Sequence, residues 1–163
     1  MTQEEKIAIA ETVRHRDRFG PVSQEELAAL SGKETELWIQ TKNGYCVHVF
    51  EERPEALPDR APILLNFHGG GFLKGRTDRE RRYCCAVMEA TNALVWDVDY
   101  SLAPEKPFPY AAEESYGIIQ YVFEHAEELC IDPEKIMLAG HSAGGNLVAS
   151  ALVKNAETKA FHP

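Results

Sequence analysis

The sequence is poor in positive charge, and this shortage excludes one class of partner. It has 17 Lys and Arg residues against 26 Asp and Glu, a formal net charge of -9 and a pI near 5.2. A nucleic-acid surface needs clustered Lys and Arg, so none is expected here. The densest basic run, residues 76–82, is interrupted by Asp78 and Glu80. We interpret this run as the solvated start of a helix rather than as an anion site.

Long apolar runs and a leader pattern are also lacking. No apolar stretch approaches the roughly twenty residues that span a bilayer, and residues 1–5 have neither the basic nor the apolar region of a signal peptide. These absences predict a cytoplasmic protein without a membrane span. The four cysteines lack metal-ligand spacing, and the adjacent Cys84 and Cys85 cannot readily bridge. We expect reduced, mostly buried thiols and no metal or organic cofactor.

The first part of the chain has the pattern of two short helices. Thr2-x-x-Glu5 and Ser23-x-x-Glu26 are capping-box patterns, and Gly20-Pro21 separates the helices that they would start. The apolar stripe of the first helix is weak, so this helix is expected to need a partner surface.

After residue 36 the hydrophobic period changes. Alternating residues around Asn43-Gly44 predict a hairpin over 36–49. Short apolar runs then alternate with helical patterns, which is typical of a parallel sheet covered by helices on both faces. The sequence therefore predicts an α/β fold, with strands at 63–67, 93–98 and 135–140 and helices at 79–91, 113–129 and 143–155.

A serine lies at the predicted junction between the last strand and the last helix. Residues 140–144 read Gly-His-Ser-Ala-Gly and match G-x-S-x-G. This pattern is typical of a sharp strand-to-helix turn, here called the elbow, in which the central serine, Ser142, has a strained backbone and projects its hydroxyl above the sheet. Glycines remove side chains that would collide there. The helix that follows has unpaired N–H groups which favour negative charge.

A second glycine-rich motif follows the first predicted buried strand. His68 is followed by Gly69, Gly70 and Gly71. Such a loop lets backbone N–H groups approach the anionic oxygen of a tetrahedral intermediate. A phosphate-binding loop would instead require a helix at the glycines with Lys or Ser/Thr in register, but Phe72 follows.

The segment from Asp99 to Glu105, Asp-Tyr-Ser-Leu-Ala-Pro-Glu, followed by Pro-Phe-Pro at 107–109, closely resembles a segment of the hormone-sensitive-lipase-like esterases. The resemblance extends from about residue 36 to 155, with all three motifs in family order. It implies an α/β-hydrolase that acts on small-molecule carboxylic esters, without a cofactor. It also implies a domain of residues 36–163, preceded by cap-like helices in 1–35.

The same resemblance assigns roles to individual residues. Ser142 is implied as the nucleophile, Gly70, Gly71 and Ala143 as the oxyanion donors, and His68 and Gly69 as support for the oxyanion loop. Two positions depart from the family. Ser101 replaces the usual Arg, which puts the packing of its loop in doubt, and His141 replaces a frequent Asp. His141 adjoins Ser142 on a sharp turn, so it is not expected to be the base.

The catalytic acid and base of this fold follow the serine in the chain. Only Glu157 and His162 come after Ser142 in that order, and the predicted helix would carry them to its far end. We therefore expect the N-terminal half of an α/β-hydrolase, a three-layer sheet truncated after the elbow helix. The strand at 135–140 would then be an exposed edge, covered by a second copy or by a separate C-terminal half.

Two functions follow as hypotheses. The first is ester hydrolysis through an acyl-enzyme at Ser142, impaired in this chain because the acid and the histidine are absent; the same serine could also act on amides or peptides. The second is a non-catalytic fragment with a role in binding or assembly.

Overall fold

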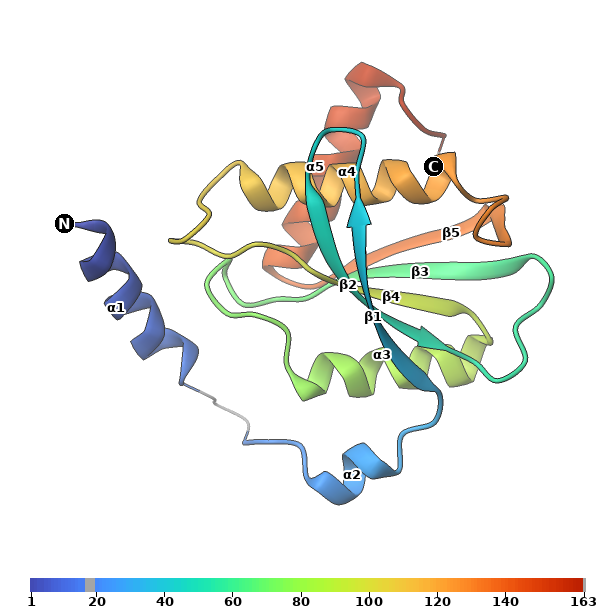
Figure 1. Ribbon diagram of the computed structural model, residues 1–163, viewed down its shortest axis with the longest axis horizontal. Helices are drawn as coiled ribbons and strands as arrows, with labels where there is room; N and C mark the ends of the chain where they lie inside the picture. Colours follow the sequence, from blue (N-terminus) through green and yellow to red (C-terminus); the bar gives the residue numbers. More distant parts are fainter. Residues whose placement is uncertain (17–19, 163) are drawn as a thin grey trace.

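The computed structural model describes residues 1–16 and 20–162, which form a sheet with helices packed against it (Figure 1). The strands are β1 (Lys33–Gln40), β2 (Cys46–Arg53), β3 (Ala61–Phe67), β4 (Leu94–Asp99) and β5 (Ile131–Gly140). The helices are α1 (Gln3–Arg14), α2 (Gln24–Ala28), α3 (Asp78–Thr91), α4 (Tyr110–Glu124) and α5 (Ala143–Thr158).

The sheet is mixed, with the strand order β1-β2-β4-β3-β5. β3 pairs in parallel with both β4 and β5, as expected where helices connect the strands. The predicted hairpin forms β1 and β2, which are antiparallel to each other, and β2 is antiparallel to β4. Within the described residues β5 pairs with β3 alone, so its other edge carries no strand.

Helices cover both faces of this sheet, which confirms the predicted α/β class. α3 packs on one face, where Cys84 and Met88 meet Leu64 and Val95. α4 and α5 pack on the other face over the larger core, which includes Trp96. Figure 1 shows these layers, with α3 on the opposite side of the sheet from α4 and α5.

The N-terminal helices begin at the predicted caps. The hydroxyl of Thr2 accepts from the N–H of Glu5, and the hydroxyl of Ser23 accepts from the N–H of Glu26. In each pair the glutamate carboxylate accepts in turn from the backbone N–H of the capping residue. α1 finds its partner surface through Arg14, which donates to the carbonyls of residues 73 and 103 at 2.8 and 3.0 Å. The assignment of these helices as a cap remains a prediction.

Several element boundaries differ by a few residues from those expected, and two of the larger differences are the end of α4 and the start of β5. α4 ends at Glu124 rather than at residue 129, and a turn follows in which Cys130 has a left-handed φ of 57°. The N–H of Ile131 donates to the carbonyl of Ala126, the bond pattern of a Schellman turn. β5 starts four residues early, because Ile131 already pairs with Ala61. The register then shifts between Ala61 and Ile63, over the part of β5 that contains Pro133, which cannot donate to a regular ladder.

The basic run is also placed differently from the expectation. Arg76 is not solvated: its side chain is only 11% exposed, and its guanidinium pairs with the fully buried Asp97 at 2.5 Å and with Glu34. Arg81 pairs with the buried Glu52 at 3.3 Å. The acidic partners lie on strands β1, β2 and β4. They are distant in the sequence, so the pattern of residues 76–82 alone could not predict that these arginines are paired.

Cysteine burial follows the expectation for two of the four residues. Cys84 and Cys85 are buried, and burial raises the pKa of both thiols, that of Cys85 to about 12. Cys46 and Cys130 are exposed. Among the described residues, no helix combines the length and the apolar character needed to cross a membrane.

Candidate active site

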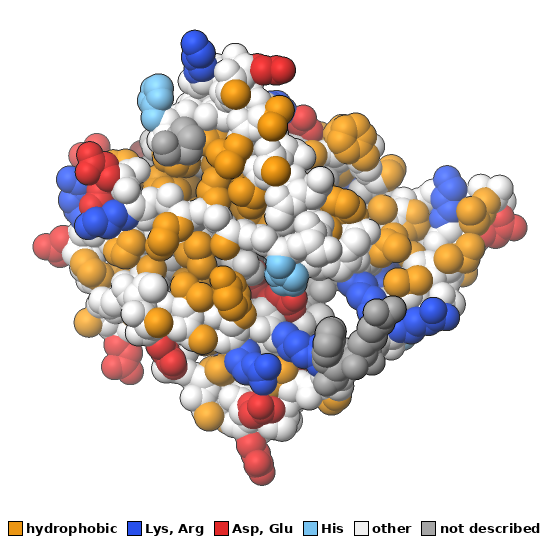
Figure 2. Space-filling model, turned by 180° about the vertical axis from the view of Figure 1, so that it is seen from behind, with side chains coloured by type: hydrophobic (Ala, Val, Ile, Leu, Met, Phe, Trp, Pro, Cys, Tyr) orange, Lys and Arg blue, Asp and Glu red, His pale blue; other side chains and the backbone are white. Residues whose placement is uncertain are grey.

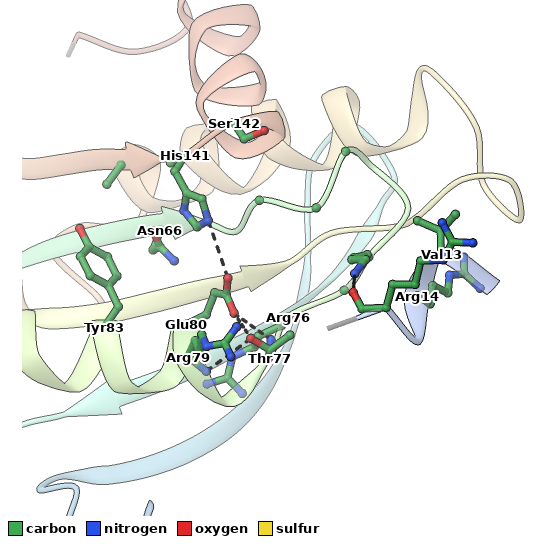
Figure 3. A pocket seen from close by; sticks show the side chains of 18 residues that line it. Val13, Arg14, Asn66, Arg76, Thr77, Arg79, Glu80, Tyr83, His141 and Ser142 are labelled. Carbon is green, nitrogen blue, oxygen red and sulfur yellow. Dashed lines mark hydrogen bonds and ion pairs between the residues drawn. The ribbon is translucent and has the colours of Figure 1, made fainter. Parts of the chain in front are cut away.

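Ser142 lies at the junction of β5 and α5 in an unusual backbone conformation. Its φ is 53° and its ψ is -118°. A residue other than glycine adopts such angles only when its surroundings impose them. Its side chain is exposed at the start of α5, pointing away from the sheet (Figure 3). The local geometry is therefore that of a strained turn that presents a hydroxyl.

The flanking glycines allow this turn to pack tightly. A Cβ built on Gly144 would lie 1.8 Å from the carbonyl oxygen of Phe67, at the end of β3. A Cβ on Gly140 would lie 2.5 Å from the carbonyl carbon of Gly144. The start of α5 thus sits against the backbone of β3, and no side chain fits between them.

The glycine loop after β3 faces the same site. Gly70 and Gly71 have φ values of 129° and 63°, in the range that favours glycine. The carbonyl of Gly70 accepts from the N–H groups of Leu73 and Lys74 at 3.2 and 3.1 Å, which closes the loop. In the described chain, the N–H groups of Gly70, Gly71 and Ala143 donate to no protein acceptor. Three backbone donors therefore remain available beside Ser142.

His68 is fully buried behind this loop. Its Nδ1 lies 2.8 Å from the carbonyl oxygen of Gly69, and its ring stacks on Tyr100 with centroids 4.2 Å apart. The hydroxyl of Tyr100 donates to the carbonyl of His68 at 2.7 Å. The His68 Nε2 atom lies 3.6 Å from an Asp99 oxygen. Burial lowers the pKa of His68, but Asp99, the Gly69 carbonyl and the charge of Asp97 together outweigh burial, so the pKa is raised.

Asp99 also contacts a histidine that carries no sequence motif. The Nδ1 atom of His48 lies 3.1 Å from the other Asp99 oxygen. Burial raises the pKa of Asp99, but the two histidines outweigh it and lower the pKa overall. His48 and Asp99 are register partners on the antiparallel strands β2 and β4, and this pairing is the feature that could have identified His48. That pairing could not be deduced before the strand order was known.

The departure at Ser101 is compensated locally. Its N–H donates to one oxygen of the buried Glu114 at 2.6 Å, and its hydroxyl donates to the other at 2.5 Å. Glu114 comes from α4, so the loop that begins at Ser101 is attached to a core helix. The Glu114 carboxylate therefore fixes the loop at Ser101, the position where the family usually has Arg.

A cleft of about 1420 Å³ opens in front of these elements. Ser142, His141 and the glycine loop form one wall, α3 contributes Glu80 and Tyr83, and the end of α1 contributes Val13 (Figure 3). Figure 2 shows Lys and Arg side chains gathered toward the lower right of one face. The cleft is large enough for a small molecule, and five of the described residues that line it are basic.

No catalytic base accompanies Ser142 among the described residues. The His141 ring lies against Gly69 and points to Glu80, with 3.8 Å between its Nε2 and a Glu80 oxygen (Figure 3). Glu157 lies in the last turn of α5 and His162 beyond it, while Ser142 precedes the first turn. This 16-residue helix is roughly 24 Å long, so neither residue reaches the serine. The described side chains also contain no cluster of three or more His, Cys, Asp or Glu that could hold a metal ion.

The sequence and structure match known proteins over most of the chain. Residues 64–163 match the family model described as alpha/beta hydrolase fold. The chain belongs to the α/β-hydrolase fold family. This confirms the fold that the motifs predicted. The roles of the individual site residues remain predictions.

The relatives of this α/β-hydrolase include esterases and a lipase. It is 41% identical to esterase LipI of Mycobacterium tuberculosis over 59% of this chain and 31% of that protein. It is 36% identical to human hormone-sensitive lipase over 64% of this chain and 10% of the lipase. Among solved structures, "Bacterial Heroin Esterase" superposes with a TM-score of 0.76 and 30% identity, over 98% of this chain and 49% of that one. The chain spans less than half the length of each.

Proposed function

We propose that this α/β-hydrolase is a carboxylic-ester hydrolase in which Ser142 forms the acyl-enzyme. The observation that carries the proposal is the strained Ser142 conformation beside the N–H groups of Gly70, Gly71 and Ala143, which donate to no acceptor among the described residues. An ester carbonyl bound there would be attacked by the hydroxyl, and its developing oxyanion would accept from these donors. The dipole of α5 adds to that stabilisation, because its N-terminus begins at Ala143.

His68 and Gly69 would support this hole without touching the substrate. His68 is fully buried, and its contacts with Gly69, Tyr100 and Asp99 hold the start of the glycine loop. Its role in the proposal is to position the donors. The N-terminal helices would cover the cleft as a cap, since α1 is attached to the loops at its border through Arg14.

Proton transfer would come from outside this chain. The Ser142 hydroxyl makes no hydrogen bond to a histidine in the described residues, and the free edge of β5 is adjacent to the elbow. We propose that a C-terminal half carrying the acid and the base pairs with β5, as a separate polypeptide or as further sequence. Alone, the chain would lack the base, whose loss costs about a millionfold in kcat in a serine hydrolase.

The test is the time course of p-nitrophenyl acetate cleavage by the chain and by Ser142→Ala. After subtraction of spontaneous hydrolysis, we expect the original chain to release up to one equivalent of p-nitrophenolate more than the variant. This release should be slow because the base is absent, and it should stall because the acyl-enzyme is not hydrolysed. Mass spectrometry of the stalled protein should show one added acetyl group on Ser142. Equal release by both proteins, with no acetylated serine, would overturn the proposal.

A second candidate function, assembly without catalysis, is favoured by the β5 edge itself. Unpaired strand edges promote association, and this strand also exposes Met137 at 40%. Sedimentation velocity distinguishes the occupants: a concentration-dependent dimer indicates a second copy at the edge. A monomer over the whole range would count against self-pairing and leave the C-terminal half as the proposed partner.

A further inference from the structure

The candidate cleft has a charge opposite to that of the chain. Acidic residues outnumber basic ones in the sequence. Among the described residues that line the cleft, however, Glu80 is the only acidic one, against five basic side chains: Arg14, Arg16, Lys74, Arg76 and Arg79. A concave surface lined by one sign of charge concentrates ligands of the opposite sign. The cleft that contains Ser142 can therefore attract anions, although the chain as a whole is acidic.

Two of these cations are already neutralised by carboxylates. Arg14 pairs with Glu11 at 2.5 Å and with Glu105 at 2.6 Å. Arg76 pairs with Asp97 and Glu34, as described above. These two guanidinium groups hold the walls of the cleft together and contribute little charge to a ligand.

Arg16 and Lys74 are different. The ammonium of Lys74 donates to the backbone carbonyl of Arg16, which is neutral. In residues 1–16 and 20–162, no carboxylate lies within ion-pair distance of either side chain. Arg16 is exposed and Lys74 is half-buried. Their charges are thus available to a ligand in the cleft.

Lys74 is placed next to the oxyanion loop by the backbone itself. Its N–H donates to the Gly70 carbonyl at 3.1 Å, and a Cβ built on Gly70 would lie 2.9 Å from the Cβ of Lys74. The side chain of Lys74 therefore begins beside the proposed oxyanion loop, and Lys74 lines the same cleft as Ser142. The bond to Arg16 brings the end of α1 to the same border of the cleft.

We propose that this site selects esters that carry a carboxylate beyond the ester bond, and that Arg16 and Lys74 bind that carboxylate. The inference rests on the proposed function, since it names the substrate class of the same serine. In water, one unit charge about 4 Å from another changes an affinity about fivefold. Two cations, partly screened by salt, should give a preference of about tenfold at low ionic strength.

The test compares two fluorophosphonate probes with alkyl chains of equal length, one ending in a methyl group and one in a carboxylate. The measurement is the rate at which each probe modifies Ser142, followed by intact-protein mass spectrometry and divided by its rate of reaction with hydroxide. We expect the carboxylate probe to label about tenfold faster at low salt. In 1 M NaCl, where the screening length is about 3 Å, the ratio should approach one.

Variants then assign the preference to the two cations. The double variant Arg16→Gln/Lys74→Met should reduce the ratio to near one. Lys159→Met, which removes the same charge at the opposite end of α5, should retain it. The salt series needs no variant, so it decides the question even if the double variant does not fold.

The outcomes separate the two proposals. Equal labelling of Ser142 by both probes at low salt would overturn the anionic-substrate inference and leave the ester-hydrolase proposal intact. A preference that survives both 1 M NaCl and the double variant would also overturn the inference. Labelling by neither probe would overturn both proposals, provided that the protein is folded and is incubated with enough probe, and for long enough, to detect the roughly millionfold slower reaction expected without the base.

Discussion

Replacing Gly144 with alanine tests how tightly the serine turn is held against the sheet. The new Cβ would lie 1.8 Å from the Phe67 carbonyl oxygen and 2.7 Å from that of His68, far inside the ordinary contact range of 3.4–4 Å. Both oxygens belong to backbone that is fully buried at the end of β3. β3 lies between β4 and β5, so it has no free side to move toward.

The size of the effect follows from this geometry. Overpacking a core usually costs about 1–3 kcal/mol and occasionally more. Because a central strand must shift, we expect Gly144→Ala to lower the free energy of unfolding by about 3 kcal/mol or more, a large part of the ~5–15 kcal/mol that stabilises a domain.

The neighbouring glycine provides the matched control. A Cβ on Gly145 would lie 3.0 Å from the nearest atom, the Gly140 carbonyl oxygen. Alanine is favoured over glycine within a helix by about 1 kcal/mol, which should offset that tight contact. We expect Gly145→Ala to stay within about 1 kcal/mol of the original chain.

Urea unfolding followed by far-UV circular dichroism measures both variants under the same conditions. The expected result is a transition at clearly lower urea for Gly144→Ala than for Gly145→Ala. Coincident transitions would refute the reasoning, since they would show that the elbow does not press on β3.

Three further predictions concern strain and titration. Ser142→Gly should be more stable than Ser142→Ala by about 1 kcal/mol in urea unfolding, because only glycine relieves the backbone strain at a φ of 53°; equal stability would contradict this. Burial raises the pKa of Glu52 to about 7, against about 4.3 when unfolded, so the chain should lose stability as the pH rises through this interval. Glu52→Gln should therefore gain stability relative to the original chain by about 2–3 kcal/mol between pH 4 and 8, and a difference independent of pH would rule this out. Asp99→Asn should lower the pKa of His68 in an NMR titration, because burial then acts with less opposition; an unchanged pKa would show that Asp99 does not set it.

The sequence predicts best where one local requirement determines the residues. Gly140 and Gly144 are needed wherever a strand turns so sharply into a helix, so the pattern predicts the turn without knowledge of the rest of the fold. The capping boxes at Thr2 and Ser23 are equally local, because each joins groups three residues apart. These features were therefore found at the expected positions.

Long-range charge pairing is where sequence reasoning failed. Arg76 reads as a surface residue because its neighbours in the chain are charged, yet its partner Asp97 lies 21 residues away on a fully buried strand position. Asp97 itself occupies an apolar run, where a carboxylate is stable only with such a partner. The burial of Arg76 depends on the order of the strands, which hydrophobic periodicity does not encode.

The order of the strands also shows which part of the chemistry this chain can supply. The glycine loop follows β3 and Ser142 follows β5, and these two strands are neighbours. The contact between Gly144 and Phe67 joins the two loops directly, so the proposed oxyanion hole and nucleophile are assembled without any other part of the sheet. A base would have to approach from the free side of β5, where the described chain has no strand. Reactivity of Ser142 in this chain would therefore measure the contribution of the oxyanion hole and strained turn separately from that of proton transfer, two effects that are difficult to separate in a complete serine hydrolase.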